Sequence, residues 1–533
     1  MKKIIYTLGV LIIVIFANIS CDDTLDLAPI DYYGSGNFWK TLSQTEAYVN
    51  GIHLDLRSTN FTRKFLMGEA RGGLQKIGTS SQGLSTYNDI IKSNSLDGNN
   101  PGLSSWAGLY GNIFDCNLVI QMVEGSDIHK NNKEKVDVLL GQTYGIRALY
   151  YFTLYRAYGG VPLITRVKVL DGQVSPTDLY TARATPKEIM DFIKSDIQKS
   201  LDYFGTYQDA GPINNVMWTK VASQMLAAEI YLWSAKVSLG NQKPAADDLS
   251  KAENYLLEVK NDSRFGLLNN FEDVFSAKNE KNKEIIFAIN YADGEATSNA
   301  GDFVYAPQNM IGIFYDRNGK KIDTDILDLR GTGWQRYEYT NEFWLSFDEK
   351  DKRREATFMD YYNDKGDLEG TVLKKFLGSI NSAGNRVFDT NEPFYRYADV
   401  LLMLAEVENM KGGDPAKYIN EIRKRAYGND FDAGTDSYHN SDFKTNELEI
   451  LKERDREFVY EGKRWYDVCR LKDAKDGKPL AFDNASTYRG LPVLKSNETH
   501  KLLWPVDKNT LNNDPLLKQT PGYKVGEQEE ETW

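Results

Sequence analysis

The chain has 533 residues, of which 41% are hydrophobic and 26% are charged, so it is long enough for a large core and has the composition of an ordinary globular protein. Its net charge of -12 disfavours contact with a phosphate backbone, and we therefore exclude nucleic acid as a partner. Its four histidines and three cysteines lie far apart, without the spacing of a metal site, and we expect neither a metal nor a cofactor.

The first twenty residues have the pattern of a signal peptide. A basic start, Lys2-Lys3, precedes an apolar run over residues 4–16 that is too short to span a membrane. A small residue and then Cys21 follow this run, which resembles a bacterial lipobox. The resemblance implies that Cys21 carries acyl chains, palmitate included, which anchor the mature chain to a membrane. The two acidic residues that follow resemble a signal for export to the cell surface.

Helical periodicity dominates the next part of the chain. Residues 24–37 are expected to be an extended tether, and residues 67–102, rich in Gly, Ser and Asn, to be a long loop region of the kind that often carries function. Apolar residues three and four positions apart predict helices over residues 43–56, 103–122, 144–158, 185–204, 216–239 and 247–260.

The composition changes near residue 279. Residues 284–290 predict a strand, and residues 292–380 are a second loop-rich region with many aromatic side chains. Two helices joined by a Gly-Gly turn are expected over residues 392–426.

Residues 447–471 predict one long amphipathic helix. Gly462 falls on its apolar stripe, which indicates that a neighbouring element packs very close. We expect Glu453, Glu457 and Glu461 to be solvated or ion-paired rather than catalytic.

Three further side chains are expected to be structural. Cys116 and Cys469 lie in helical patterns, which favours buried thiols over a disulfide. Arg147 is expected to anchor helix packing rather than to bind a ligand.

Several separated stretches carry motifs of a single family. They are RALYYFTLYRAYGGVP at 147–162, RYADVLLMLAE at 396–406 with INEIRKRA at 419–426, EGKRWYDVCR at 461–470, and LWPV at 503–506 with TPGY at 520–523. These motifs resemble those of the SusD/RagB family, which consists of nutrient-capturing outer-membrane lipoproteins of Bacteroidetes. The resemblance implies a mainly α fold, in which tetratricopeptide-like helical pairs form a scaffold for a loop-rich, minor-β ligand-binding region. It also implies a signal peptide over 1–20, a helical domain over 21–280, and a domain over 281–533 with ligand loops and late helices.

The family resemblance also implies a function. The chain is expected to be a surface-exposed outer-membrane lipoprotein that binds an oligo- or polysaccharide. It would deliver this glycan to a SusC-like TonB-dependent transporter, without catalysing a reaction.

Aromatic and polar residues of the two loop regions are the candidates for ligand contact. Sugar capture uses flat aromatic faces together with amide and charged groups for the hydroxyls. The candidates are Trp334, Tyr337 and Tyr339 from the later loop region, and Arg71, Tyr87 and Asn88 from the earlier one. Each of them has packing or bracing of a loop as its alternative role.

Other functions stay open at this stage. The same lipoprotein could carry a peptide, which would be held more by backbone hydrogen bonds than by aromatic stacking. A glycoside hydrolase would need two suitably spaced carboxylates, and no catalytic motif points to such a pair. A purely structural helical scaffold would bind no small ligand.

Overall fold

The computed structural model describes most of the chain, namely residues 38–78, 86–103, 105–172, 174–207 and 214–533. The expected signal peptide, the lipidation site Cys21 and the expected tether lie outside these ranges. Within them, none of the helices combines the length and the apolar composition that crossing a bilayer requires.

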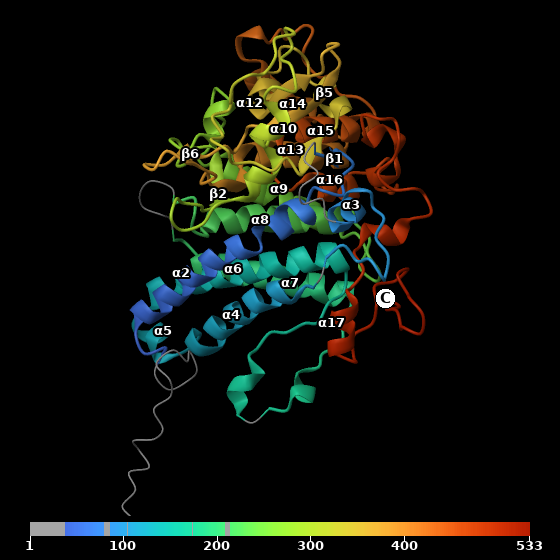
Figure 1. Ribbon diagram of the computed structural model, residues 1–533. Helices are drawn as coiled ribbons and strands as arrows, with labels where there is room; N and C mark the ends of the chain where they lie inside the picture. Colours follow the sequence, from blue (N-terminus) through green and yellow to red (C-terminus); the bar gives the residue numbers. More distant parts are fainter. Residues whose placement is uncertain (1–37, 79–85, 104, 173, 208–213) are drawn as a thin grey trace, which may run out of the picture.

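The helices predicted for the first half of the chain are confirmed. They are α2 (Leu42–Ser58), α4 (Ala107–Val123), α6 (Lys133–Tyr158), α7 (Pro186–Phe204), α8 (Lys220–Lys236) and α9 (Ala246–Lys260), with the shorter α3 (Thr86–Lys92) and α5 (Asp127–Asn131). Consecutive long helices contact each other, α6 with α7, α7 with α8, and α8 with α9. In Figure 1, α2, α4, α6 and α7 lie together in the lower half of the molecule, with α8 above them. The mainly α scaffold of paired helices is therefore confirmed.

Local sequence explains where these helices begin and how they pack. At the start of α7, Thr185 and Glu188 form a capping box, and Pro186 occupies the first turn. Arg147 of α6 donates from Nε and Nη2 to the carboxylate of Asp196 on α7, over 2.7 and 2.8 Å. Arg147 thus anchors helix packing, as expected.

The described strands are short and pair antiparallel, and two of the pairs join segments far apart in the sequence. Strand β1 (Gln75–Ile77) pairs with β3 (Tyr337–Tyr339), and β2 (Ile285–Ile289) pairs with β8 (Glu392–Arg396). Strand β4 (Phe358–Tyr362) pairs with β5 (Leu368–Leu373), and β6 (Ser379–Ile380) pairs with β7 (Arg386–Val387). The strand predicted at residues 284–290 is confirmed as β2. The pairing of β1 with β3 brings the two predicted loop regions together.

The second half of the chain contains a further group of helices. The expected hairpin is formed by α13 (Tyr397–Lys411) and α14 (Ala416–Tyr427), and α15 (Phe443–Glu457) and α16 (Arg464–Arg470) follow it. Shorter helices are α10 (Pro307–Met310), α11 (Asn341–Leu345), α12 (Lys352–Thr357) and α17 (Lys508–Asn513). In Figure 1, α13, α14 and α15 lie above α8 and α9, and α13 contacts both of these helices.

The prediction of one helix over residues 447–471 was wrong. Helix α15 ends at Glu457 and α16 begins at Arg464. Between them, the Glu69 carboxylate accepts the backbone N–H groups of Tyr460 and Gly462, each over 2.9 Å, and both residues have positive φ. A tertiary contact therefore replaces the helical hydrogen bonds. The close neighbour expected at Gly462 is confirmed, because a Cβ there would collide with the carbonyl oxygen of Lys64.

The three glutamates of this stretch are ion-paired and buried. Arg396 contacts Glu457 over 2.6 Å and Glu461 over 2.8 Å, and Arg353 contacts Glu453 over 2.7 Å. Buried charges need such partners, because leaving one without a partner costs several kcal/mol. The charged motifs of the late helices thus build the interior of the fold.

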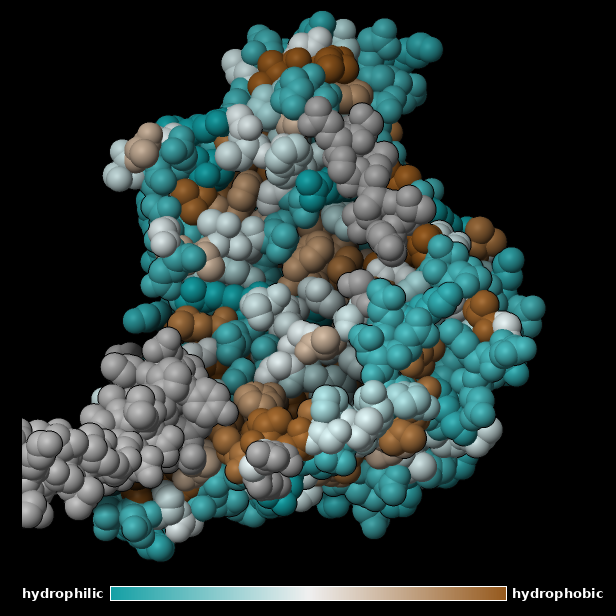
Figure 2. Space-filling model, turned by 60° about the horizontal axis from the view of Figure 1, so that its bottom comes forward, coloured by the Kyte–Doolittle hydropathy of each residue, from teal (hydrophilic) through white to brown (hydrophobic). Residues whose placement is uncertain are grey.

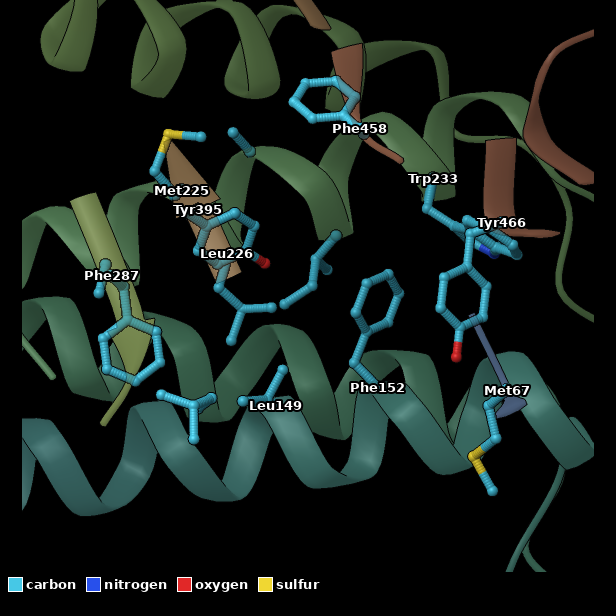
Figure 3. Packing of buried hydrophobic residues seen from close by; sticks show 14 of the residues in the cluster. Met67, Leu149, Phe152, Met225, Leu226, Trp233, Phe287, Tyr395, Phe458 and Tyr466 are labelled. Carbon is cyan, nitrogen blue, oxygen red and sulfur yellow. The ribbon is translucent and has the colours of Figure 1, made fainter. Parts of the chain in front are cut away.

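A hydrophobic core runs from the early helices to the late ones. Figure 3 shows Leu149 and Phe152 of α6 and Leu226 of α8 pointing into a common interior, with Tyr395 of β8 and Tyr466 of α16 beside them. A second, smaller cluster is formed by residues of the later loop region itself, namely Val304, Tyr305, Met310, Ile322, Leu329, Tyr361 and Val372. The later loop region therefore has a small hydrophobic core of its own.

Candidate functional site

A hollow of about 510 Å³ lies beside Trp334 in the later loop region. The Trp334 side chain is 48% exposed, which is unusual for so large an apolar ring. The hollow is lined by Thr297, Ser298, Asn299, Gly301, Asp302, Gln308, Gly331, Thr332, Gly333, Trp334 and Phe388. Elsewhere, the face drawn in Figure 2 is mostly hydrophilic, with hydrophobic side chains in separate groups.

Backbone hydrogen bonds fix the loop that carries Trp334. The N–H groups of Trp334 and Arg336 donate to the carbonyls of Gly301 and Asp302, over 2.9 and 2.7 Å. Gly333 has a φ of +123°, and a Cβ there would collide with the carbonyl oxygen of Tyr305. Only glycine therefore allows this loop to lie so close to the neighbouring segment.

The backbone on both sides of Trp334 is conformationally strained. Asp328, Arg330 and Gln335 have φ values of 52°, 54° and 42°. Such backbone conformations cost roughly 1–3 kcal/mol each and persist where the surrounding structure enforces them. Arg386 supplies part of that enforcement, because its guanidinium donates to the carbonyls of Leu327 and Asp328 over 3.0 and 3.1 Å. Strain of this kind is concentrated at functional sites in many proteins.

A buried carboxylate lines the hollow, and a guanidinium pairs with it from the edge. Asp302 is only 8% exposed, and burial raises the pKa of its carboxyl group, with Arg336 opposing the rise. Arg336 Nη1 lies 3.3 Å from Asp302 Oδ1, and the guanidinium carbon lies 5.3 Å from the centre of the Trp334 ring. Aromatic, amide, hydroxyl and carboxylate groups thus meet at one hollow, which suits a ligand with apolar faces and hydroxyl groups.

The expected ligand residues fall into two groups. Trp334 lines the hollow, whereas Tyr337, Tyr339 and Arg71 are buried and do not line it, so that contact of these three with a ligand stays a prediction. Tyr337 stacks on Phe303, with ring centres 5.2 Å apart, and the Tyr339 hydroxyl donates to Glu69.

Arg71 has a structural role as well. It is fully buried, and its guanidinium lies 4.1 Å from the ring centre of Trp465 and 4.8 Å from that of Trp504. Tyr87 and Asn88 belong to α3, but the described part of the chain does not include their side chains. Cys21 also lies outside the described residues. Cys116 and Cys469 are buried and free, as expected.

Sequence reasoning missed several residues of the hollow. Asp302, Asn299, Gln308 and Phe388 have no motif that marks them. A weak signal was present, however, because glycines on both sides of Thr332 lead directly into Trp334, which indicates a tight turn that presents a large ring.

Two protein families match the chain. The SusD family matches residues 366–523, and a family described as starch-binding and associating with the outer membrane matches residues 48–232.

Individual relatives match over most of their own length. A SusD superfamily protein from Bacteroides fragilis is 42% identical, with 91% of this chain and 100% of that chain covered and a TM-score of 0.84. NanU of B. fragilis is 29% identical, with 94% of this chain and 100% of that chain covered and a TM-score of 0.77. The starch-binding protein SusD of Bacteroides thetaiotaomicron is 23% identical over 77% of each chain.

Proposed function

This chain belongs to the SusD family, and from that premise we propose that it is a non-catalytic outer-membrane lipoprotein that binds a glycan and delivers it to a TonB-dependent transporter. The description of one matching family as starch-binding and outer-membrane-associated supports this proposal. The name of the B. thetaiotaomicron relative, a starch-binding protein, supports it as well. The anchor would be an acylated Cys21, which rests on the sequence pattern.

The observation that carries the proposal is the half-exposed Trp334 beside a buried carboxylate. The faces of a pyranose ring present C–H groups that pack on an indole, and its edges present hydroxyls that need donors and acceptors. Asp302, Asn299 and Gln308 supply such groups around the same hollow. Its volume lies within the range of about 300–1,000 Å³ that is usual for ligand sites.

The charge of the site favours a neutral glycan. Among the described residues that line the hollow, Asp302 is the one charged side chain, and Arg336, which does not line the hollow, pairs with it from the edge. The whole chain carries a net charge of -12. A sulfated or uronic-acid glycan would therefore meet like charge as it approaches.

The same lining supports binding without turnover. Glycoside hydrolysis uses two carboxyl groups that lie roughly 5–10 Å apart on either side of the scissile bond. The described lining supplies Asp302 without a second carboxylate. We therefore propose capture of a glycan rather than its cleavage.

Affinity electrophoresis against a panel of neutral and anionic polysaccharides tests the proposal. We expect retarded migration on a neutral glycan, and loss of this retardation in Trp334→Ala. Tyr207→Ala is the matched control, because it removes another exposed aromatic ring, on the helical half of the molecule. Retardation that survives in Trp334→Ala would discard the site, and binding to peptides but to no glycan would favour peptide cargo.

The anchor and the partner need a separate experiment. The Cys21→Ser variant is expected to lose incorporation of labelled palmitate and to leave the outer-membrane fraction. Wild-type protein isolated from outer membranes is expected to retain a TonB-dependent transporter. Palmitate incorporation that is unchanged in Cys21→Ser would contradict the anchor.

A further inference from the structure

A second cavity, of about 200 Å³, lies between the helical half and the late segments of the chain. It shares no lining residue with the hollow at Trp334. Its lining comes from α6, α8, α16 and the segments after α8 and α16, and consists of Arg156, Trp233, Val237, Ser238, Leu239, Trp465, Cys469, Lys472, Asp476, Gly477, Pro479, Leu502 and Leu503.

The lining of this cavity is largely aromatic and aliphatic. Trp233 and Trp465 are 4% and 1% exposed, and Leu239, Leu502 and Leu503 also line the space. The volume equals that of roughly six or seven water molecules at about 30 Å³ each. It can therefore hold a molecule of about one ring, and flat walls favour a flat ring.

Lys472 contributes a cation without a partner. Its side chain lines the cavity and the residue is 8% exposed, while its backbone N–H donates to Glu447 over 2.9 Å. Within the described ranges, no direct ion pair or hydrogen bond of its ammonium is seen. Burial and the nearby Lys236 lower the pKa of Lys472, and the carboxylates of Asp476, Glu447 and Asp473 oppose this effect. The ammonium itself is half-buried, and an anion inside the cavity would stabilise it.

Arg156 adds a second group that favours an anion. Its Nη1 donates to Glu229 over 2.6 Å, and its guanidinium lies 3.7 Å from the centre of the Tyr466 ring. Its Nε is buried and has no hydrogen-bond partner among the described residues. Figure 3 shows Tyr466 beside Trp233 at this end of the core.

The polar groups of Lys472 and Arg156 are therefore hydrogen-bond donors and not acceptors. A sugar would need acceptors inside the cavity as well, and Ser238 and Asp476 are both exposed at its edge. We propose that this cavity binds a small aromatic carboxylate, whose ring lies beside Trp233 and Trp465 and whose carboxylate pairs with Lys472.

Isothermal titration calorimetry of the full-length chain with benzoate, benzamide and glucose tests this proposal. Benzamide has nearly the shape of benzoate but carries no charge. We expect saturable binding of benzoate, and at least about tenfold weaker binding of benzamide, because hydrogen bonds to charged groups are the stronger ones. No saturable binding of benzoate, equal affinities for benzoate and benzamide, or binding of glucose in place of benzoate would overturn the proposal.

Matched variants locate the site. Lys472→Gln is expected to lower benzoate affinity to the level of benzamide, whereas Lys475→Gln removes the same charge from an exposed neighbour and should change nothing. Leu239→Trp alters a half-buried side chain and should fill the cavity and abolish binding. Trp334→Ala should bind benzoate as the wild type does, which separates this site from the proposed glycan site. Full benzoate affinity in both Lys472→Gln and Leu239→Trp would contradict the assignment.

Discussion

Asp302 and Arg336 form an ion pair at the edge of the hollow, with Arg336 Nη1 3.3 Å from Asp302 Oδ1. The same guanidinium lies over the ring of Trp334. Arg336 therefore connects the carboxylate and the aromatic ring on which the proposed glycan site depends. The protonation state of Asp302 should affect the site for this reason.

Glycan binding is expected to weaken at acidic pH. Burial raises the pKa of Asp302 above its ordinary value of 3.8, although Arg336 opposes the rise. As the pH falls through this raised pKa, the carboxylate gains a proton and loses both its charge and part of its acceptor capacity. Calorimetric titrations between pH 7 and about pH 4 measure the effect. Asp302→Asn should bind weakly at every pH, and a wild-type affinity that stays constant over this range would contradict the role of Asp302.

Gly333→Ala is expected to reduce glycan affinity about as much as Trp334→Ala does. A methyl group at residue 333 would collide with the carbonyl of Tyr305 and displace the loop. Gly319→Ala is the control, because Gly319 also has positive φ and open space around its Cβ position, but does not line the hollow. Calorimetry with the same glycan compares the two variants. Equal affinities of the two would contradict the importance of the close approach at Gly333.

Glu229→Gln is expected to destabilise the fold at neutral pH. Burial raises the pKa of Glu229, but Arg156 and Lys463 outweigh this effect and lower it to about 2, from an ordinary value of 4.5. The ionised group therefore stabilises the fold above pH 4.5, and this contribution is lost as the pH falls towards 2. Removing one partner of a buried ion pair costs about 3–5 kcal/mol.

Guanidinium denaturation measures this difference in the free energy of unfolding. The gap between wild type and Glu229→Gln should narrow between pH 4.5 and pH 2. Glu295→Gln is the control, because Glu295 is a 60% exposed partner of Arg57, and its loss should cost less than about 1 kcal/mol. If the difference in the free energy of unfolding between wild type and Glu229→Gln stays constant or widens at low pH, the lowered pKa of Glu229 would be contradicted.

Gly462→Ala is expected to destabilise the fold by more than about 2 kcal/mol, because it combines backbone strain with a collision against Lys64. Gly294→Ala carries a similar backbone strain at a φ of +80°, but no atom lies within 4 Å of its Cβ position. It should cost only about 1 kcal/mol. Thermal and chemical unfolding compare the two variants. Similar losses in both would show that the close packing at Gly462 contributes little.

The sequence predicted what depends on local periodicity. Helices such as α6 and α7 follow from apolar spacing and capping residues, and these signals lie within each helix. The break between α15 and α16 does not follow from periodicity, because it depends on Glu69, which lies 393 residues before Gly462.

Contacts between segments far apart in the sequence also determine which aromatic residues are exposed at the candidate site. Trp334, Tyr337 and Tyr339 are aromatic residues of one short stretch, and nothing in the sequence distinguishes the exposed ring from the buried ones. Strand β3 pairs with β1, and this pairing holds both tyrosines in the core. Asp302 reaches Trp334 through contacts between separate loops, which a single sequence does not reveal.

The central claim is that Trp334 forms the binding surface for a neutral glycan. Calorimetric titration of wild type, Trp334→Phe and Trp334→Ala with a glycan that retards the wild type in electrophoresis tests it most directly. We expect strong binding by wild type, partial binding by Trp334→Phe, which keeps a smaller ring, and none by Trp334→Ala, because stacking of a sugar on the indole is lost. Wild-type affinity in Trp334→Ala, with the fold intact by circular dichroism, would contradict the claim.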